Sequence, residues 1–81
     1  MELQDTIELM QSEDYKERFK AEYYQTEIRY EKLHKMVIKY EAGTLNFTPN
    51  CSLELFKRQL AAMGNYLYCL EMRAEIESIE L

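Results

Sequence analysis

Apolar residues recur at alternating spacings of three and four in two long segments of the chain. In the second segment these positions are Leu53, Phe56, Leu60, Met63, Leu67, Leu70 and Ala74. In the first they are Phe19, Tyr23, Thr26, Tyr30, Leu33, Val37 and Tyr40. This period places each set on one face of a helix. The pattern therefore predicts helices over about residues 13–42 and 52–80, each with one seam that another element must cover.

The segment 43–51 (GTLNFTPNC) lies between the two predicted helices and carries no charge. It holds the turn-forming residues Gly43, Asn46, Pro49 and Asn50. A connection of this length suits antiparallel neighbours, so residues 12–81 are predicted to form an antiparallel helical hairpin. Leu45 and Phe47 are expected to pack against its closed end.

The predicted ends of the helices follow from capping residues. Ser12 is a plausible N-cap for the first helix, and Gly43 suits the left-handed position after its last turn. Thr48, Cys51 and Ser52 are candidate caps for the second. Upstream, residues 1–11 fit a short amphipathic helix through Leu3, Ile7 and Met10. So short a helix must dock on something or fray.

A hairpin leaves apolar residues without cover. Ala62, Tyr66, Cys69 and Ile76 form a second stripe on the second helix, and Tyr24, Ile28, Met36 and Ile38 are extra apolar residues on the first. A helix that is apolar over more than a third of its circumference needs a second neighbour. The small residues Ala61, Ala62 and Gly64 would let another helix approach closely. The alternative is that Gly64 has no such role and is merely tolerated inside the helix. The sequence predicts an all-α fold in which hairpins assemble into a homo-oligomeric helical bundle.

Charge and composition exclude several classes of function. The chain has 15 acidic and 10 basic residues, a net charge of −5, which argues against coating DNA or RNA. No apolar run approaches membrane-spanning length, so no membrane partner is expected. The N-terminus lacks the features of a signal peptide, and Cys51 and Cys69 lie too far apart for an intrachain disulfide. We expect an intracellular protein of the cytoplasm.

The residues form no recognisable catalytic constellation, phosphate loop or metal motif, so neither an enzyme nor a cofactor is expected. Basic residues gather instead at the loop end of the hairpin, where the N-terminus of the second helix also favours anions. Hydrogen-bonding and aromatic side chains accompany them. The candidate ligand-binding residues are Lys39, Tyr40, Thr44, Asn46, Thr48, Lys57 and Arg58. The competing interpretation is an ordinary capped turn with surface lysines.

Four short motifs carry a family resemblance over roughly residues 13–81. They are DYKER, YEKLHKM, YEAGTLNFTPNC and MGNYL. With them the chain resembles a family of small proteins from gut phages and prophages, named after a crAss-like phage protein. The resemblance implies a phage or prophage origin and a helical hairpin, but no site residues. The layout is also similar to phage anti-CBASS and anti-Thoeris hairpin sponges, which sequester cyclic nucleotide signals in pockets between protomers.

Three hypotheses for function remain at this point. The first is a phage anti-defence protein, a sponge whose oligomer sequesters a cyclic nucleotide immune signal between protomers without catalysis. The second is a protein-binding module that inhibits or scaffolds a host or phage protein, docking through the acidic residues Glu2, Asp5, Glu8, Glu13 and Asp14. The third is a purely structural oligomer with no small ligand.

Overall fold

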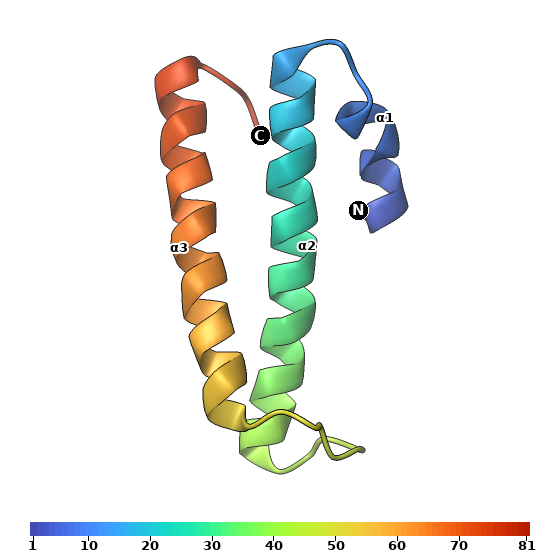
Figure 1. The fold of residues 1–81 in the computed structure, drawn as a ribbon, viewed down its shortest axis with the longest axis vertical. Helices are drawn as coiled ribbons and strands as arrows, with labels where there is room; N and C mark the ends of the chain where they lie inside the picture. Colours follow the sequence, from blue (N-terminus) through green and yellow to red (C-terminus); the bar gives the residue numbers. More distant parts are fainter.

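The computed structural model describes all residues 1–81, and its regular structure is entirely helical. The chain begins with a 3-10 turn, η1 (Leu3–Thr6), which continues directly into α1 (Ile7–Met10). Two long helices follow, α2 (Tyr15–Ala42) and α3 (Leu53–Glu77). They run side by side in opposite directions and are joined by a loop at one end (Figure 1). The predicted all-α hairpin with a short N-terminal helix is confirmed, while its assembly into an oligomer stays a prediction.

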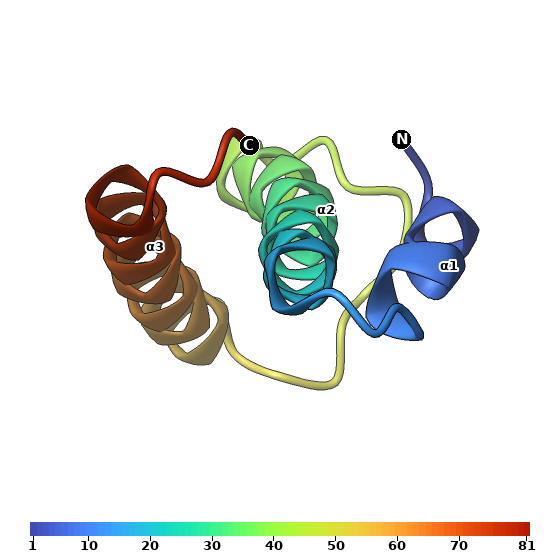
Figure 2. The same ribbon diagram turned by 90° about the horizontal axis from the view of Figure 1, so that it is seen from above.

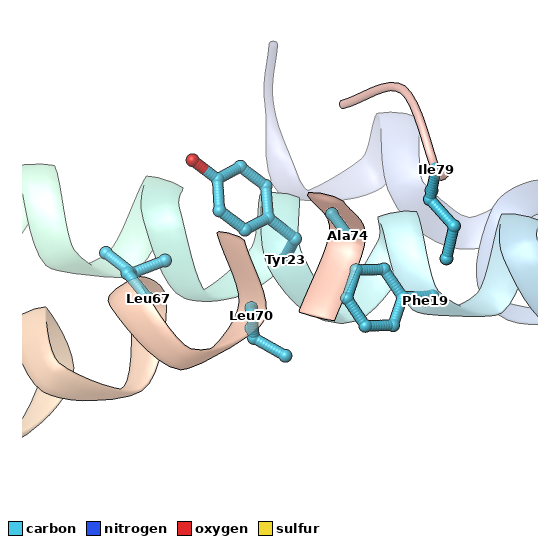
Figure 3. Close-up of a cluster of buried hydrophobic side chains, with 6 residues drawn as sticks. All are labelled: Phe19, Tyr23, Leu67, Leu70, Ala74 and Ile79. Carbon is cyan, nitrogen blue, oxygen red and sulfur yellow. The ribbon is translucent and has the colours of Figure 1, made fainter. Parts of the chain in front are cut away.

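The two predicted seams face each other along the hairpin, and none of their residues is exposed. Burial is deepest at the open end, where α2 begins and α3 ends. There a cluster of six buried side chains forms the core (Figure 3): Phe19, Tyr23, Leu67, Leu70, Ala74 and Ile79. Toward the loop end only Val37 is buried, while Leu33 and Leu60 are half-buried. The hairpin is therefore packed more tightly at its open end.

Capping side chains set the start of each long helix. α2 begins after Asp14, whose carboxylate accepts a hydrogen bond of 2.9 Å from the backbone N–H of Lys16. The prediction that Ser12 caps this helix is wrong, because the Ser12 hydroxyl instead accepts from the N–H of Asp14 at 3.0 Å. α3 begins after Ser52, one of the predicted candidates, whose hydroxyl accepts from Leu55 N–H at 3.2 Å.

The C-terminal residues return to the core. α3 ends at Glu77, short of the predicted residue 80, because Ser78 takes the left-handed conformation with φ of 57°. The N–H of Ile79 then donates to the carbonyl of Ala74 at 2.8 Å. This turn places Ile79, which is only 6% exposed, against Phe19 in the core cluster.

The N-terminal segment packs on α2, on the side that faces away from α3 (Figure 2). Thr6 is fully buried there, and its hydroxyl accepts a hydrogen bond of 2.9 Å from the side-chain amide of Gln25. Ala21 is buried on α2 as well. Two short turns thus gain from tertiary packing the stability that a helix of this length lacks alone.

Much apolar surface stays exposed on this single chain. Only nine of 81 residues are buried, which is little burial even for a small domain. The second stripe of α3 faces solvent, and Tyr66 and Ile76 are 41% and 76% exposed. Neither long helix contains a stretch long and apolar enough to cross a membrane.

Candidate functional site

The loop reverses direction at Gly43 and returns along α2. Gly43 adopts a φ of 78°, in the left-handed region that favours glycine. Its N–H donates to the carbonyl of Tyr40 at 3.2 Å, and the N–H of Thr44 donates to that of Lys39 at 2.9 Å. These two bonds satisfy the carbonyls of Lys39 and Tyr40, which lack a partner within the last turn of α2. They also place the residues after Gly43 beside the last two turns of that helix.

A pocket of about 350 Å³ lies between these turns and the loop. We call it the lysine pocket. α2 contributes Lys32, Lys35, Met36 and Lys39, and the loop contributes Thr44, Leu45, Asn46 and Phe47. The three lysines are spaced by three and four, so they share one face of α2.

The lysine pocket is positively charged. All three of its lysines are exposed, and none belongs to either of the ion pairs in the structure, Lys57–Glu41 and Arg73–Glu77. No carboxylate lines the pocket. Three ammonium groups around one open space repel one another, and an anion placed between them relieves that repulsion.

A smaller pocket of about 160 Å³ adjoins the lysine pocket. It is lined by Tyr40, Gly43, Leu45, Phe47, Thr48 and Pro49, so the two pockets share Leu45 and Phe47. Phe47 is 55% exposed. The expectation that it packs against the closed end of the hairpin is wrong, because the loop carries its ring outward to the boundary of the two pockets. An exposed ring at that place is available for stacking on a planar ligand.

The structure distributes the seven predicted ligand residues over three places. Lys39, Thr44 and Asn46 line the lysine pocket, and Tyr40 and Thr48 line the adjoining one. Lys57 lies elsewhere and pairs with Glu41 at 2.8 Å. Arg58 lines neither pocket, and no residue of α3 does, so the N-terminus of this helix is not part of the site.

Five residues of the lysine pocket were not among the predicted ligand residues: Lys32, Lys35, Met36, Leu45 and Phe47. The spacing of the three lysines was a usable signal, because it places them on one face. What could not be read from the pattern is that the loop folds back over that face.

The largest pocket of the molecule, about 650 Å³, lies at the open end between α2 and the residues around the end of α3. Its lining includes Asp14, Glu17, Glu75 and Glu80 but only two lysines, Lys16 and Lys20. Carboxylates outnumber ammonium groups there, which disfavours an anionic ligand. Nowhere in the molecule is a group of three or more His, Cys, Asp or Glu side chains arranged to hold a metal ion.

Comparison with known proteins identifies one family. A family model described as Sequestin matches residues 13–76, which is well over half of the chain and covers α2, the loop and nearly all of α3. Neither the curated proteins nor the solved structures yield a match. The matched region contains the whole lysine pocket. The chain belongs to the Sequestin family.

Proposed function

We propose that this protein is a phage-encoded anti-defence protein that sequesters a cyclic nucleotide immune signal without catalysis. Membership in the Sequestin family suggests a sequestering, binding role rather than a catalytic one. The observation that carries the proposal is the lysine pocket, where three unpaired lysines and no carboxylate lie beside an exposed phenylalanine ring.

Each part of the pocket suits one part of such a ligand. The ammonium groups of Lys32, Lys35 and Lys39 neutralise phosphates, and the ring of Phe47 stacks on a base. Thr44 and Asn46 offer hydrogen bonds to sugar or base edges. No bond is made or broken, so protection is stoichiometric: each site removes one signal molecule from the host pathway.

In a single chain the lysine pocket is open to solvent, and this openness weakens its affinity for an anionic ligand. Exposed charges are screened by salt over about 8 Å at physiological ionic strength. Tight binding therefore requires that the ligand be covered, and we propose that the protein acts as a homo-oligomer in which a second protomer closes the site. The same argument predicts that affinity falls as salt concentration rises.

A specific observation favours a second candidate, a protein-binding module. The five acidic residues of the N-terminal segment named above are all exposed. Asp5 and Glu2 form a capping box at the start of η1, and Asp14 caps α2, which leaves Glu8 and Glu13 free to face a basic partner surface. This candidate and the first use different ends of the molecule, so one truncation separates them.

The first experiment is native mass spectrometry of the protein expressed in a bacterium that carries cyclic-nucleotide synthases. An oligomer with added mass matching a cyclic nucleotide is the expected result. Thermal-shift assays with a panel of cyclic di- and trinucleotides follow on ligand-free protein. A folded oligomer that carries no added mass and shows no shift with any member of the panel would overturn the proposal and favour a protein partner.

Charge reversal at the lysine pocket tests the site itself. The double variant Lys35→Glu, Lys39→Glu is expected to weaken binding by about tenfold or more per lysine, because each charge-assisted contact contributes roughly 1.5–3 kcal/mol. Both side chains are exposed, so the hairpin should stay folded. The matched control, Lys16→Glu with Lys20→Glu, makes the same charge change at the open end of α2. Equal loss in both variants would show a general charge effect and no site at the loop.

A further inference from the structure

The smaller pocket at the loop end differs from the lysine pocket in charge. Its six lining residues include no charged side chain, whereas three lysines line the other. We call the smaller one the neutral pocket. Leu45 and Phe47 line both, so the two spaces meet at these side chains. The loop end therefore offers one composite site with a cationic half and an uncharged half.

Helix α2 fixes how the two halves are placed. Lys39 and Tyr40 are consecutive, so their side chains leave the helix in different directions. Lys39 lines the lysine pocket and Tyr40 lines the neutral one. Met36, which lines the lysine pocket, is four residues before Tyr40, and residues at that spacing are neighbours on a helix surface. Apolar contact surface thus extends from one half of the site into the other.

The neutral pocket can hold only part of a ligand. Its volume is about 160 Å³, whereas sites for complete small molecules usually measure about 300–1,000 Å³. Among its lining residues, only Tyr40 and Thr48 have polar side-chain groups, one hydroxyl each. An uncharged planar group with a few hydrogen-bonding atoms at its edge suits such a lining. In a nucleotide the base is that group, and the phosphate attached through the sugar suits the lysines.

We propose that the neutral pocket is a base-recognition subsite, which receives one base of a nucleotide whose phosphate lies on Lys35 and Lys39. The assignment rests on the proposed function and adds to it the residues that distinguish one base from another. The ring of Phe47, 55% exposed, stacks on any base, because every base has a π face. The hydroxyls of Tyr40 and Thr48 bond to the edge of the base, and edges differ between bases. Affinity and base preference therefore depend on different side chains of one site.

The first test uses three cyclic dinucleotides that share their phosphates and differ in their bases: cyclic di-AMP, cyclic di-GMP and cyclic di-UMP. Calorimetry on the full chain should give affinities that differ by about tenfold or more between the best and the worst ligand. The double variant Tyr40→Phe, Thr48→Val removes both hydroxyls and keeps the side-chain shapes. It should reduce that difference to about threefold or less.

Lys35→Ala is the matched control for this test, because it changes a phosphate contact and leaves the neutral pocket intact. It should weaken binding of all three ligands by a similar factor and preserve their order. Equal affinities in wild type, or a difference that Tyr40→Phe, Thr48→Val leaves unchanged, would overturn the base subsite while the proposed function stands. Absence of binding by every cyclic nucleotide would overturn the proposed function, and the subsite with it.

The second test locates the base by fluorescence. The chain has no tryptophan, so Phe47→Trp introduces a single reporter at the boundary of the two pockets. The best-bound dinucleotide should quench its emission, because a stacked base lies against the indole ring. Ribose 5-phosphate, which carries a phosphate but no base, should leave the emission unchanged. Tyr68→Trp is the matched control: Tyr68 is 62% exposed on α3, outside both pockets, and also registers light absorbed by the nucleotide itself.

Unchanged emission from Phe47→Trp at a dinucleotide concentration that saturates the protein in calorimetry would overturn the subsite. Phe47→Ala completes the test and should weaken all three dinucleotides by about fivefold or more, the usual effect of losing one stacking ring. Light scattering should show the same mass for Phe47→Ala as for wild type. If this variant lost affinity and oligomer mass together, its ring would be a contact between protomers, and the assignment to a base would be wrong.

Discussion

At the scale of single residues, Tyr23 has the most constrained polar environment in the core. Its hydroxyl lies 2.7 Å from Oε2 of Glu71 and 3.1 Å from Oε2 of Glu27. A phenol has only one proton to donate, so this proton is shared between the two carboxylates, of which Glu71 on α3 is the nearer. The shared proton joins α2 to α3 at the edge of the core. Burial of the phenol raises the pKa of Tyr23 above its ordinary value, and the hydrogen bonds to Glu71 and Glu27 raise it further.

Replacing Tyr23 with phenylalanine tests this arrangement. Tyr23→Phe should lower the free energy of unfolding by about 1 kcal/mol at neutral pH, the usual net worth of a hydrogen bond. Because the pKa is higher in the folded state, the contribution of the phenol is fully present below the unfolded value of about 10 and is lost as pH rises above it. Urea unfolding of both proteins should show a constant difference from pH 6 to 9 that shrinks above pH 10. A difference that grows with pH would contradict the assignment. Tyr68→Phe is the control, since Tyr68 is 62% exposed.

At the scale of elements, periodicity predicted both long helices and the faces by which they pack. That signal is strong because a seam of seven positions repeats over more than twenty residues, and no Gly or Pro interrupts α2. The helix ends were less predictable. Ser12, Glu13 and Asp14 all suit a helix start, and only the backbone path shows that Asp14 is the cap. The end of α3 carries no glycine to mark it, so the return of Ile79 to the core left no sign in the sequence.

The positive charge of the candidate site was predictable from the sequence, but the set of residues that line it was not. Basic residues were expected at the loop end, and Lys39 does line the pocket there. The path of the loop decides which of the others join it. Because residues 44–47 fold back along the outer side of α2, Lys32 and Lys35 line the pocket while Arg58 does not. Such a path depends on tertiary contacts, which local patterns of charge do not specify.

Gly64 lies inside α3, where a glycine makes a helix less stable than alanine would. A Cβ built there would lie 3.8 Å from Cε2 of Tyr30, an ordinary van der Waals contact. The hairpin itself thus has room for alanine, and Gly64→Ala should raise the free energy of unfolding by about 1 kcal/mol. Gly43→Ala should lower it, because a residue with a side chain is strained at a φ of 78°. Chemical unfolding at one fixed protein concentration compares the two. A destabilised Gly64→Ala would indicate that a backbone outside this hairpin approaches α3 at that point.

At the scale of the whole molecule, the three helices lie side by side, with α2 between α1 and α3 (Figure 2). The pockets at the loop end and at the open end differ in charge. The lysine pocket draws no residue from residues 1–11, and that segment lies beside the half of α2 nearer the open end (Figure 1). The pocket proposed to bind a ligand and the acidic segment proposed to dock on a protein are therefore structurally separable.

Deletion of residues 1–11 uses this separation. It removes the hydrogen bond between Gln25 and Thr6 and uncovers Ala21, so the free energy of unfolding should fall by about 1–2 kcal/mol. If the lysine pocket holds the ligand, a truncated protein that is still helical should bind the same cyclic nucleotide with an affinity within about twofold of wild type, measured by calorimetry. If the acidic segment is instead the functional surface, truncation should abolish capture of the protein partner. A folded truncated protein that has lost nucleotide binding would mean that α1 takes part in the site, for which the lining of the pocket provides no route.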